Sequence, residues 1–394
     1  MLRRCWQERW WNDRAVLKLT PEQQAFGDTL RAFVAREIAP HVNAWDEAEG
    51  FPRELYLKAA AIGLLGIGYP ERFGGTEVDF TWRLIASAEL ARAGSGGLLA
   101  SLFSHNIGLP PIVAHGSEEL QQRVVPKVLA GEAISALAVT EPGGGSDVAA
   151  VATHAQRDGD HYVIDGEKVF ITSGMRADFI TVAVRTGGPG AGGISLLLVE
   201  GDRPGLARSS LKKMGWWMSD TAHLRFDKCR VPAANLIGEE NRGFAAIMDN
   251  FNGERLLLAA GSWAFAQVCY DEALQWARDR HTFGAPLIER QVIRHKFADM
   301  KMRIESTRAW IFDLVERHAA GGTDAAWVAE VALAKNHATQ SLQWCADQAV
   351  QILGGMGFMR GTKCERIYRE VKVMMIGGGS EEIMKDLAAR QLGL

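Results

Sequence analysis

Glu254 is the side chain whose type and surroundings point most directly to chemistry. If its segment is helical, the positions three, four and seven residues away lie on the same face. Those positions are mostly apolar, and they hold Ile247, Asn250, Phe251, Leu257, Leu258 and Gly261. A carboxylate there is either near the surface with a partner or partly desolvated, with a raised pKa suited to taking up a proton. Arg255 points about 100° away on an ideal helix, so it does not neutralise Glu254 locally.

A glycine-rich stretch at residues 139–147 follows an apolar strand that we expect over residues 135–138. Its glycines let the backbone approach a phosphate group or a flat ring closely, and they can expose several N–H groups together. Thr140 and Ser146 add hydroxyl donors to the same stretch. By itself, the pattern fits a flexible turn as well as a ligand-binding loop.

Two further glycine clusters lie at expected helix boundaries in the C-terminal part of the chain. Residues 351–357 end a helical pattern, where glycine is a common C-cap. Residues 377–379 precede a helix that begins with Ser380 as N-cap and has Glu381 and Glu382 in its first turn. Both clusters therefore have an ordinary structural explanation that needs no ligand.

Several chemical signatures are missing from the sequence. It has no G-x-G-x-x-G fingerprint between a strand and a helix and no Walker A pattern, so the usual nucleotide-binding folds are unsupported. It has no H-E-x-x-H pair, no C-x-x-C pair and no G-x-S-x-G elbow, so zinc, redox-disulfide and serine-hydrolase chemistry are unsupported. We expect no metal site, reduced structural cysteines, and His281 and His295 at the surface.

Composition narrows the class of partner. The 394 residues exceed the size at which one hydrophobic core stops growing, so several structural units are expected. A net charge of -3 without a basic stripe argues against a nucleic-acid partner. No apolar run reaches the roughly 18 residues that a transmembrane helix needs, so we expect no membrane span and a cytoplasmic protein. Small molecules are the expected partners.

Periodicity divides the chain into three sections with an extension in front. Residues 19–132 follow a helical period, and residues 133–237 follow the alternating period of strands. Residues 238–394 return to long helical runs, which predict an antiparallel bundle. Residues 1–18 are expected to be a variable or disordered extension, with an amphipathic surface helix packed on the body or on a membrane as the alternative. The predicted fold class is α+β, in the order helical, β, helical.

Local signals predict where elements begin and turn. The first helix should begin with Thr20 as N-cap and Pro21 in its first turn. Residues 162–172 should form a hairpin that turns at Asp165 and Gly166. Further strands are expected at residues 179–185, 194–200 and 221–226.

Taken together, these patterns resemble the acyl-CoA dehydrogenase family from about residue 19 to the C-terminus. The resemblance rests on several motifs that occur in the family's order, and their combination is specific. The motifs are VTEPGGGSD at 139–147, GEKVFIT at 166–172, KMG at 213–215 with SDT at 219–221, RHTFG at 280–284 with Gln291, QILGGMG at 351–357, and GSEEI at 379–383. The implied fold is acyl-CoA dehydrogenase-like, with an N-terminal helical domain, a middle β domain and a C-terminal four-helix-bundle domain.

The resemblance implies that the chain binds FAD through two groups of residues. The group around the flavin ring and part of the phosphate chain is Leu137, Val139, Thr140, Ser146, Phe170 and Thr172, with Thr172 placed to hydrogen-bond near N5. The group around the pyrophosphate and adenosine is Arg280, Phe283, Gln291, Gln351, Gly354 and Gly355, together with Ser380 and Glu382. Part of this second group acts across a subunit interface in the family, so a homotetramer built as a dimer of dimers is implied.

The resemblance also selects the catalytic base. Many short- and medium-chain members carry it near the C-terminus, just before Gly-Thr, where this chain has Gly378. In the isovaleryl and long-chain branches the carboxylate comes from the helix position that matches Glu254, immediately before an Arg. Glu254 is thus the family-compatible base, and Gly377 with Gly378 suggests room for long or branched acyl chains. The residues that match substrate contacts are Ser146, Asn252, Arg255, Gly378 and Gly379.

The implied reaction is α,β-dehydrogenation of a saturated acyl-CoA thioester to the trans-2-enoyl-CoA. Glu254 would take the α-proton, the β-hydrogen would pass to the flavin as hydride, and the electrons would go to an electron-transferring flavoprotein. The amide of Gly378 would bind the thioester oxygen together with the FAD ribityl hydroxyl. Two alternatives stay open: an acyl-CoA oxidase or flavin monooxygenase that uses O2 on the same fold, and a catalytically silent acyl-CoA-binding or scaffold protein.

Overall fold

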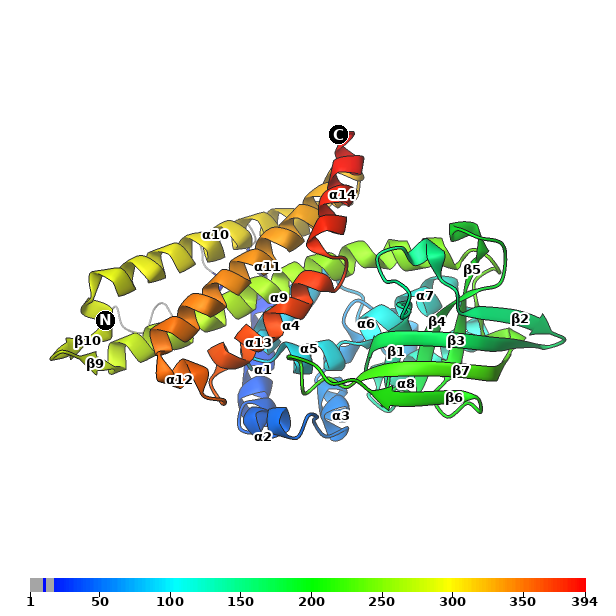
Figure 1. Ribbon diagram of the computed structural model, residues 1–394, viewed down its shortest axis with the longest axis horizontal. Coiled ribbons are helices and arrows are strands. Elements are labelled where there is room, and N and C mark those ends of the chain that lie inside the picture. The colour runs from blue at the N-terminus through cyan, green and yellow to red at the C-terminus, as the bar shows by residue number, and fades with distance from the viewer. Residues whose placement is uncertain (1–9, 12–17) are drawn as a thin grey trace.

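The computed structural model describes residues 10–11 and 18–394, and its three sections follow the predicted order of helices, strands and helices. Figure 1 shows the sheet at one end of the molecule and the long C-terminal helices reaching away from it, with the first N-terminal helices near the middle. The α+β fold class expected from the sequence is therefore confirmed.

The N-terminal section is built from helices. The first helix begins as predicted, because the Thr20 side chain accepts a hydrogen bond from the Gln23 amide while the Gln23 side chain accepts one from the Thr20 amide. Its helices are α1 (Pro21–Phe33), α2 (Val42–Glu47), α3 (Glu54–Ala61), α4 (Phe80–Ala91), α5 (Gly96–Leu102), α6 (His105–Gly108), α7 (Pro110–His115) and α8 (Glu118–Leu129), with a π-helical turn at Val34–Ile38 and 3-10 turns at Leu64–Gly66 and Glu71–Phe73.

The middle section is an 8-stranded sheet whose strands run in the order β6-β7-β3-β2-β4-β5-β8, with β1 paired to β4. The strands predicted at 179–185 and 194–200 are confirmed as β4 and β5, and the third, β7, continues beyond its predicted end. The strands are β1 (Ser135–Ala138), β2 (His154–Asp158), β3 (His161–Thr172), β4 (Phe179–Arg185), β5 (Ile194–Glu200), β6 (Leu206–Ser210), β7 (Thr221–Pro232) and β8 (Leu236–Ile237).

The predicted hairpin at residues 162–172 is wrong. β3 runs without a turn through Asp165 and Gly166, because β7 pairs with it on both sides of this point. The register shifts between Ile164 and Gly166, which marks a β-bulge. Gly166 has φ +142, and a Cβ there would lie 2.7 Å from the backbone of Thr153. The glycine that suggested a turn therefore serves a bulge and a close approach of two strands.

The C-terminal section forms the predicted antiparallel bundle. Its apolar residues at three- and four-residue spacing are buried along α10 and α11, where they face α9 and α13. The helices are α9 (Gly243–Asp279), α10 (Gln291–Ala319), α11 (Ala325–Leu353), α12 (Gly355–Phe358), α13 (Lys363–Ile376) and α14 (Glu381–Leu392), with short strands β9 (His281–Thr282) and β10 (Ala285–Pro286) before α10.

The long helix α9 joins the sections. Near its start, Ala246 and Ile247 pack in one core with β5 and with α7 and α8. Farther along, Trp263 and Phe265 pack in a second core with α4, α10 and α11. Glu254 lies between these two cores, at the level where all three sections meet. A position on a helix anchored at both ends is well suited to hold a reactive side chain.

The expected disorder of the N-terminal extension is wrong for Trp10 and Trp11. Trp10 is buried, its Nε1 donates to Asp271 at 3.3 Å, and the Arg92 guanidinium lies 3.8 Å from its ring centroid. Trp11 donates to Glu89 at 3.1 Å and stacks on Phe312. Indole rings bury a large apolar area while their N–H groups find carboxylates, which explains this packing. Residues 1–9 and 12–17 lie outside the described part.

No single helix within residues 10–11 and 18–394 is long and apolar enough to cross a membrane. One bent pair, Gly96–Leu102 with His105–His115, meets that test by length and composition alone.

Candidate active site

A cavity of about 1370 Å³ lies where the three sections meet. The helical N-terminal section contributes α4 and α5, the sheet contributes the loop after β1 and the end of β3, and the C-terminal section contributes α9 and the loop after α13. The structure brings together on this wall the predicted site residues Leu137, Val139, Thr140, Ser146, Phe170, Thr172, Glu254, Arg255, Gly378, Gly379 and Ser380.

Glu254 reaches the cavity from α9 and is half-buried there. Burial raises the pKa of its carboxyl group to about 8, and the positive charge of Arg83 opposes this rise only in part. Within the described part of the chain its carboxylate forms neither a hydrogen bond nor an ion pair. The sequence allowed either a paired carboxylate near the surface or a partly desolvated one with a raised pKa. The structure agrees with the second interpretation.

Arg255 leaves α9 in a different direction and holds two other groups. Its Nε donates to the Gly378 carbonyl at 3.0 Å, and its Nη1 donates to the Asn252 side chain at 2.9 Å. Burial lowers the pKa of Arg255 to about 10. Asn252 supports Arg255 from the same helix, and it is absent from the residues that line the cavity.

The glycine-rich loop at 139–147 is anchored by a buried ion pair. Glu141 lies 2.7 Å from the Lys168 ammonium, and it also accepts from the amides of Ala152 and Thr153. Lys168 donates in addition to the Val139 carbonyl at 3.0 Å. Glu141 and Lys168 each lie in a motif that is recognisable in the sequence. They are 27 positions apart, so no local pattern predicts that they form an ion pair. The glycine backbone of the 139–147 loop borders open space, since a Cβ at Gly143 or Gly144 would meet nothing within 4 Å.

The wall beside this loop fits a flat ring with polar edges. Phe170 has φ +62, a rare conformation for a residue with a side chain, and 67% of it is exposed although it lies in a strand. The hydroxyl groups of Thr140 and Thr172 face the same cavity and form no hydrogen bond with the described residues. Apolar surface next to unused donors is the combination that a flavin ring needs, so these residues fit the expected cofactor.

Other predicted residues lie far from this cavity. Arg280, Phe283 and Gln291 surround β9, β10 and the start of α10, and all three are exposed, Phe283 to 99%. Figure 1 shows these strands next to α12 at the end of the bundle away from the sheet. A single chain therefore does not bring these side chains to the Glu254 cavity. The same holds for Gln351, Gly354 and Gly355 at the end of α11, and Glu382 is exposed at the start of α14.

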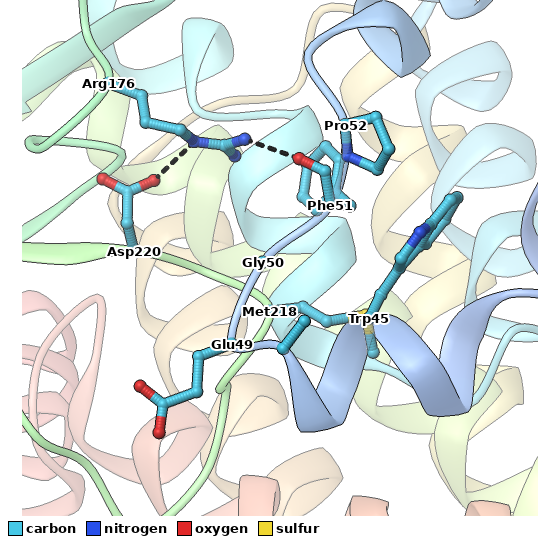
Figure 2. A pocket seen from close by; sticks show the side chains of 9 residues that line it. Trp45, Glu49, Gly50, Phe51, Pro52, Arg176, Met218 and Asp220 are labelled. Carbon is cyan, nitrogen blue, oxygen red and sulfur yellow. Dashed lines mark hydrogen bonds and ion pairs between the residues drawn. The ribbon is translucent and has the colours of Figure 1, made fainter.

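A second, smaller cavity of about 400 Å³ lies between the α2–α3 loop and the end of the sheet. Figure 2 shows Arg176 between Asp220 and the backbone of Phe51, and its Nε lies 3.0 Å from the Asp220 carboxylate. The Arg176 Nη1 donates to the Phe51 carbonyl at 2.9 Å. This cavity contains none of the predicted site residues, and its charged groups tie the N-terminal section to the sheet.

Two cationic residues near the large cavity were not predicted from the sequence as site residues. Arg83 lines the wall from α4 and donates to the carbonyls of Ile67 and Gly68 at 3.3 and 3.1 Å. Lys335, buried in α11, donates to the carbonyl of Met375 at the end of α13 and to that of Gly379 in the loop that follows. Each stands in an otherwise apolar helical run, so only the tertiary structure shows which backbone groups it meets.

Comparison with known proteins supports the geometry. Models of the acyl-CoA dehydrogenase N-terminal, middle and C-terminal domains match residues 20–132, 136–229 and 241–393. The rat mitochondrial long-chain specific acyl-CoA dehydrogenase is 36% identical over 375 residues, which cover 94% of this chain and 86% of that protein. Rice mitochondrial isovaleryl-CoA dehydrogenase is 34% identical, with 98% and 94% covered. A crystal structure of an acyl-CoA dehydrogenase from Mycobacterium smegmatis superposes with a TM-score of 0.93 at 48% identity, with 95% and 98% covered.

Proposed function

Because the chain belongs to the acyl-CoA dehydrogenase family of flavin-dependent oxidoreductases, we propose that it oxidises a saturated acyl-CoA thioester to the trans-2-enoyl-CoA with FAD and with Glu254 as the base. The observation that carries this proposal is an unpaired carboxylate on the wall of a cavity shared by all three sections. A base with a pKa near the working pH combines a deprotonated fraction with enough driving force to remove a weakly acidic proton.

Glu254 takes the α-proton in this proposal. Burial disfavours its charged form, so protonation by the substrate relieves the cost of keeping a carboxylate in an apolar wall. No cation among the described residues forms an ion pair with it, and so its affinity for the proton is preserved. The flavin, when bound, supplies the redox chemistry by accepting the β-hydrogen as hydride.

The Gly378 amide is placed to polarise the thioester carbonyl. Gly378 lines the cavity, and its N–H donates to no group within the described residues, while Arg255 holds its carbonyl. Donors aimed at the oxygen where enolate charge develops stabilise the transition state more than the ground state. A glycine is sufficient here because only the amide takes part. A Cβ at this position would lie 2.8 Å from the Leu258 side chain, so the present packing also favours glycine.

We assign the FAD-binding roles to two sets of residues. Leu137, Val139, Thr140, Ser146, Phe170 and Thr172 would hold the flavin end within one chain. The exposed set at the far end of the bundle, Arg280, Phe283, Gln291, Gln351, Gly354 and Gly355, would hold the adenosine end of a cofactor bound mainly to another subunit. The exposed side chains of Phe283, Phe358 and Met359 at that end support a subunit interface, and a homotetramer follows as the proposed assembly.

The acyl group is proposed to be long or branched. Gly377 and Gly378 leave the cavity without side chains where the loop after α13 borders it. Two of the similar proteins are named for long-chain and isovaleryl substrates, and the base on the internal helix matches what the resemblance implies for those branches. Ser146, Arg255 and Gly379 are proposed substrate contacts, with Asn252 acting through Arg255.

The proposal is tested by adding acyl-CoA thioesters of graded length and branching to the purified flavoprotein without oxygen. Bleaching of the flavin with at least one saturated thioester is expected, and a protein that holds FAD but never bleaches would refute it. Electron transfer to an electron-transferring flavoprotein or a dye supports the dehydrogenase. Stoichiometric hydrogen peroxide in air would instead identify the alternative, an oxidase on the same fold.

A further inference from the structure

Lys335 occupies a position that the helical pattern assigns to the core. Its side chain is 0% exposed, and its neighbours Ala332, Ala334 and Ala338 are buried small apolar residues. Burial and the nearby charge of Arg255 lower the pKa of Lys335 to about 8. No carboxylate of the described residues forms an ion pair with its ammonium. A buried ammonium is costly unless hydrogen bonds compensate it, so its contacts need an explanation.

Lys335 donates to backbone carbonyls at the end of α13 and in the loop that follows it. Its Nζ donates to the Met375 carbonyl at 2.9 Å and to the Gly379 carbonyl at 2.8 Å. Arg255 holds the intervening Gly378 carbonyl from the α9 side at 3.0 Å. Cations from two helices thus hold the Met375 carbonyl at the end of α13 and the Gly378 and Gly379 carbonyls in the loop that follows. The 377–379 loop is thereby held from the protein side.

The glycines of this loop add little rigidity of their own. Gly378 and Gly379 have φ +70 and φ +110, and glycine loses more conformational freedom on ordering than any other residue. Neither amide donates to a described group, and both residues line the Glu254 cavity. The Met375 carbonyl lies before the Gly378 amide in the chain, and the Gly378 and Gly379 carbonyls lie after it, so the cations hold the backbone on both sides of that amide.

We propose that Lys335 is a positioning residue for the dehydrogenation: it holds the Met375 and Gly379 carbonyls, on the two sides of Gly378, so that the Gly378 amide keeps its place toward the thioester oxygen. This inference rests on the proposed function. Removing the clamp leaves Glu254 in place but lets the amide donors move. A displacement of about 1 Å at such a site can cost roughly 100-fold in rate.

Lys335→Met tests this role because methionine is similar in length and lacks the ammonium donors. Lys385→Met is the matched control, since Lys385 pairs with Glu381 on α14 at 2.7 Å, is mostly exposed and touches no carbonyl of the loop. FAD content and melting temperature establish that both variants are folded and loaded. We expect kcat to fall about 100-fold in Lys335→Met with KM changed less than about threefold, and no change in the control.

A measurement without turnover separates positioning from general packing. Cinnamoyl-CoA, a conjugated thioester, absorbs at longer wavelength when its carbonyl accepts hydrogen bonds. We expect a red shift on binding to the natural protein and to Lys385→Met, and a much smaller shift with Lys335→Met. A folded Lys335→Met variant with the full red shift would overturn the proposal, whether or not its kcat falls.

Lys335→Gln is the second variant, because it keeps two N–H donors without the charge and should recover part of the red shift and of kcat. If neither variant folds, Lys335 is a structural residue and the positioning role is wrong. A natural protein that shifts cinnamoyl-CoA but is bleached by no acyl-CoA would instead refute the proposed function and leave the positioning role standing.

Discussion

The two walls of the large cavity each carry a half-buried carboxylate, and the two carboxylates have opposite properties. On the α9 wall, burial raises the pKa of Glu254 to about 8, and the charge of Arg83 opposes this rise only in part. On the sheet wall, burial also acts on Glu141, but hydrogen bonds from Lys168, Thr153 and Ala152 outweigh it and lower the pKa of Glu141. The same residue type is therefore set up as a proton acceptor in one place and as a permanent anion in the other.

The difference shows that partners decide the role, since both carboxylates face the same cavity. Glu141 gives its lone pairs to a lysine and two backbone amides, and so it fixes the glycine-rich loop. Glu254 keeps its lone pairs unused and available to a ligand. The carboxylate on the sheet wall thus supports the loop, and the carboxylate on the α9 wall is free to react with a ligand.

Removing the unpaired carboxylate should have the largest effect on activity. Glu254→Gln should keep FAD bound and lower the rate of anaerobic flavin bleaching by about 10²- to 10⁴-fold, because a general base is lost. Glu381→Gln, at the start of α14 where Glu381 pairs with Lys385, is the control. Undiminished bleaching would remove Glu254 from the mechanism. Recovery in Glu254→Gly with Gly378→Glu would show that the cavity accepts a base either from α9 or from the loop after α13.

Breaking the paired carboxylate should act on stability. Lys168→Met leaves Glu141 buried without its cation and is expected to destabilise the fold by about 3–5 kcal/mol. The melting temperature should fall clearly, and FAD should dissociate more readily as the glycine-rich loop loosens. The double variant Lys168→Met with Glu141→Leu should regain part of the loss. Equal melting temperatures for Lys168→Met and the natural protein would show that the pair does not anchor the loop.

The pH dependence of activity should report the raised pKa. Glu254 acts in its deprotonated form, so kcat/KM should rise with pH and level off above about 8. Arg83 lowers the pKa of Glu254, so Arg83→Gln should move this limb to higher pH. The pH profile of kcat/KM for both proteins checks the shift. An unchanged profile in Arg83→Gln would mean that the charge of Arg83 does not affect the pKa of Glu254.

The smallest expected effect is on the pH dependence of stability. The folded-state pKa of Glu254 lies above its unfolded value, so its contribution to stability is complete at low pH and is lost as pH rises toward about 8. Glu254→Gln should therefore gain stability relative to the natural protein at pH 9 but not at pH 4. Melting curves at the two pH values test this. A constant difference would mean that the carboxylate is solvated in the folded state.

Much of the fold follows from local signals in the sequence. The N-cap at Thr20, the strands at 179–185 and 194–200 and the helical period of the last section all appear where the pattern predicts them. The errors arise where a distant partner decides the outcome. Gly166 was predicted to form a turn, but the pairing of β3 with β7 places it in a β-bulge. Trp10 and Trp11 were predicted to lie in a disordered extension, but they donate hydrogen bonds to Asp271 and Glu89 far along the chain.

The candidate site shows the same division. The sequence alone determined the family, the glycine-rich loops, and Glu254 as the carboxylate to consider, because these depend on residue type and short spacing. Only the tertiary structure decided that Glu254 is unpaired and Glu141 is paired, and that Lys335 and Arg255 clamp one loop from two helices. Burial and hydrogen bonding depend on contacts between positions far apart in the chain, which periodicity does not encode.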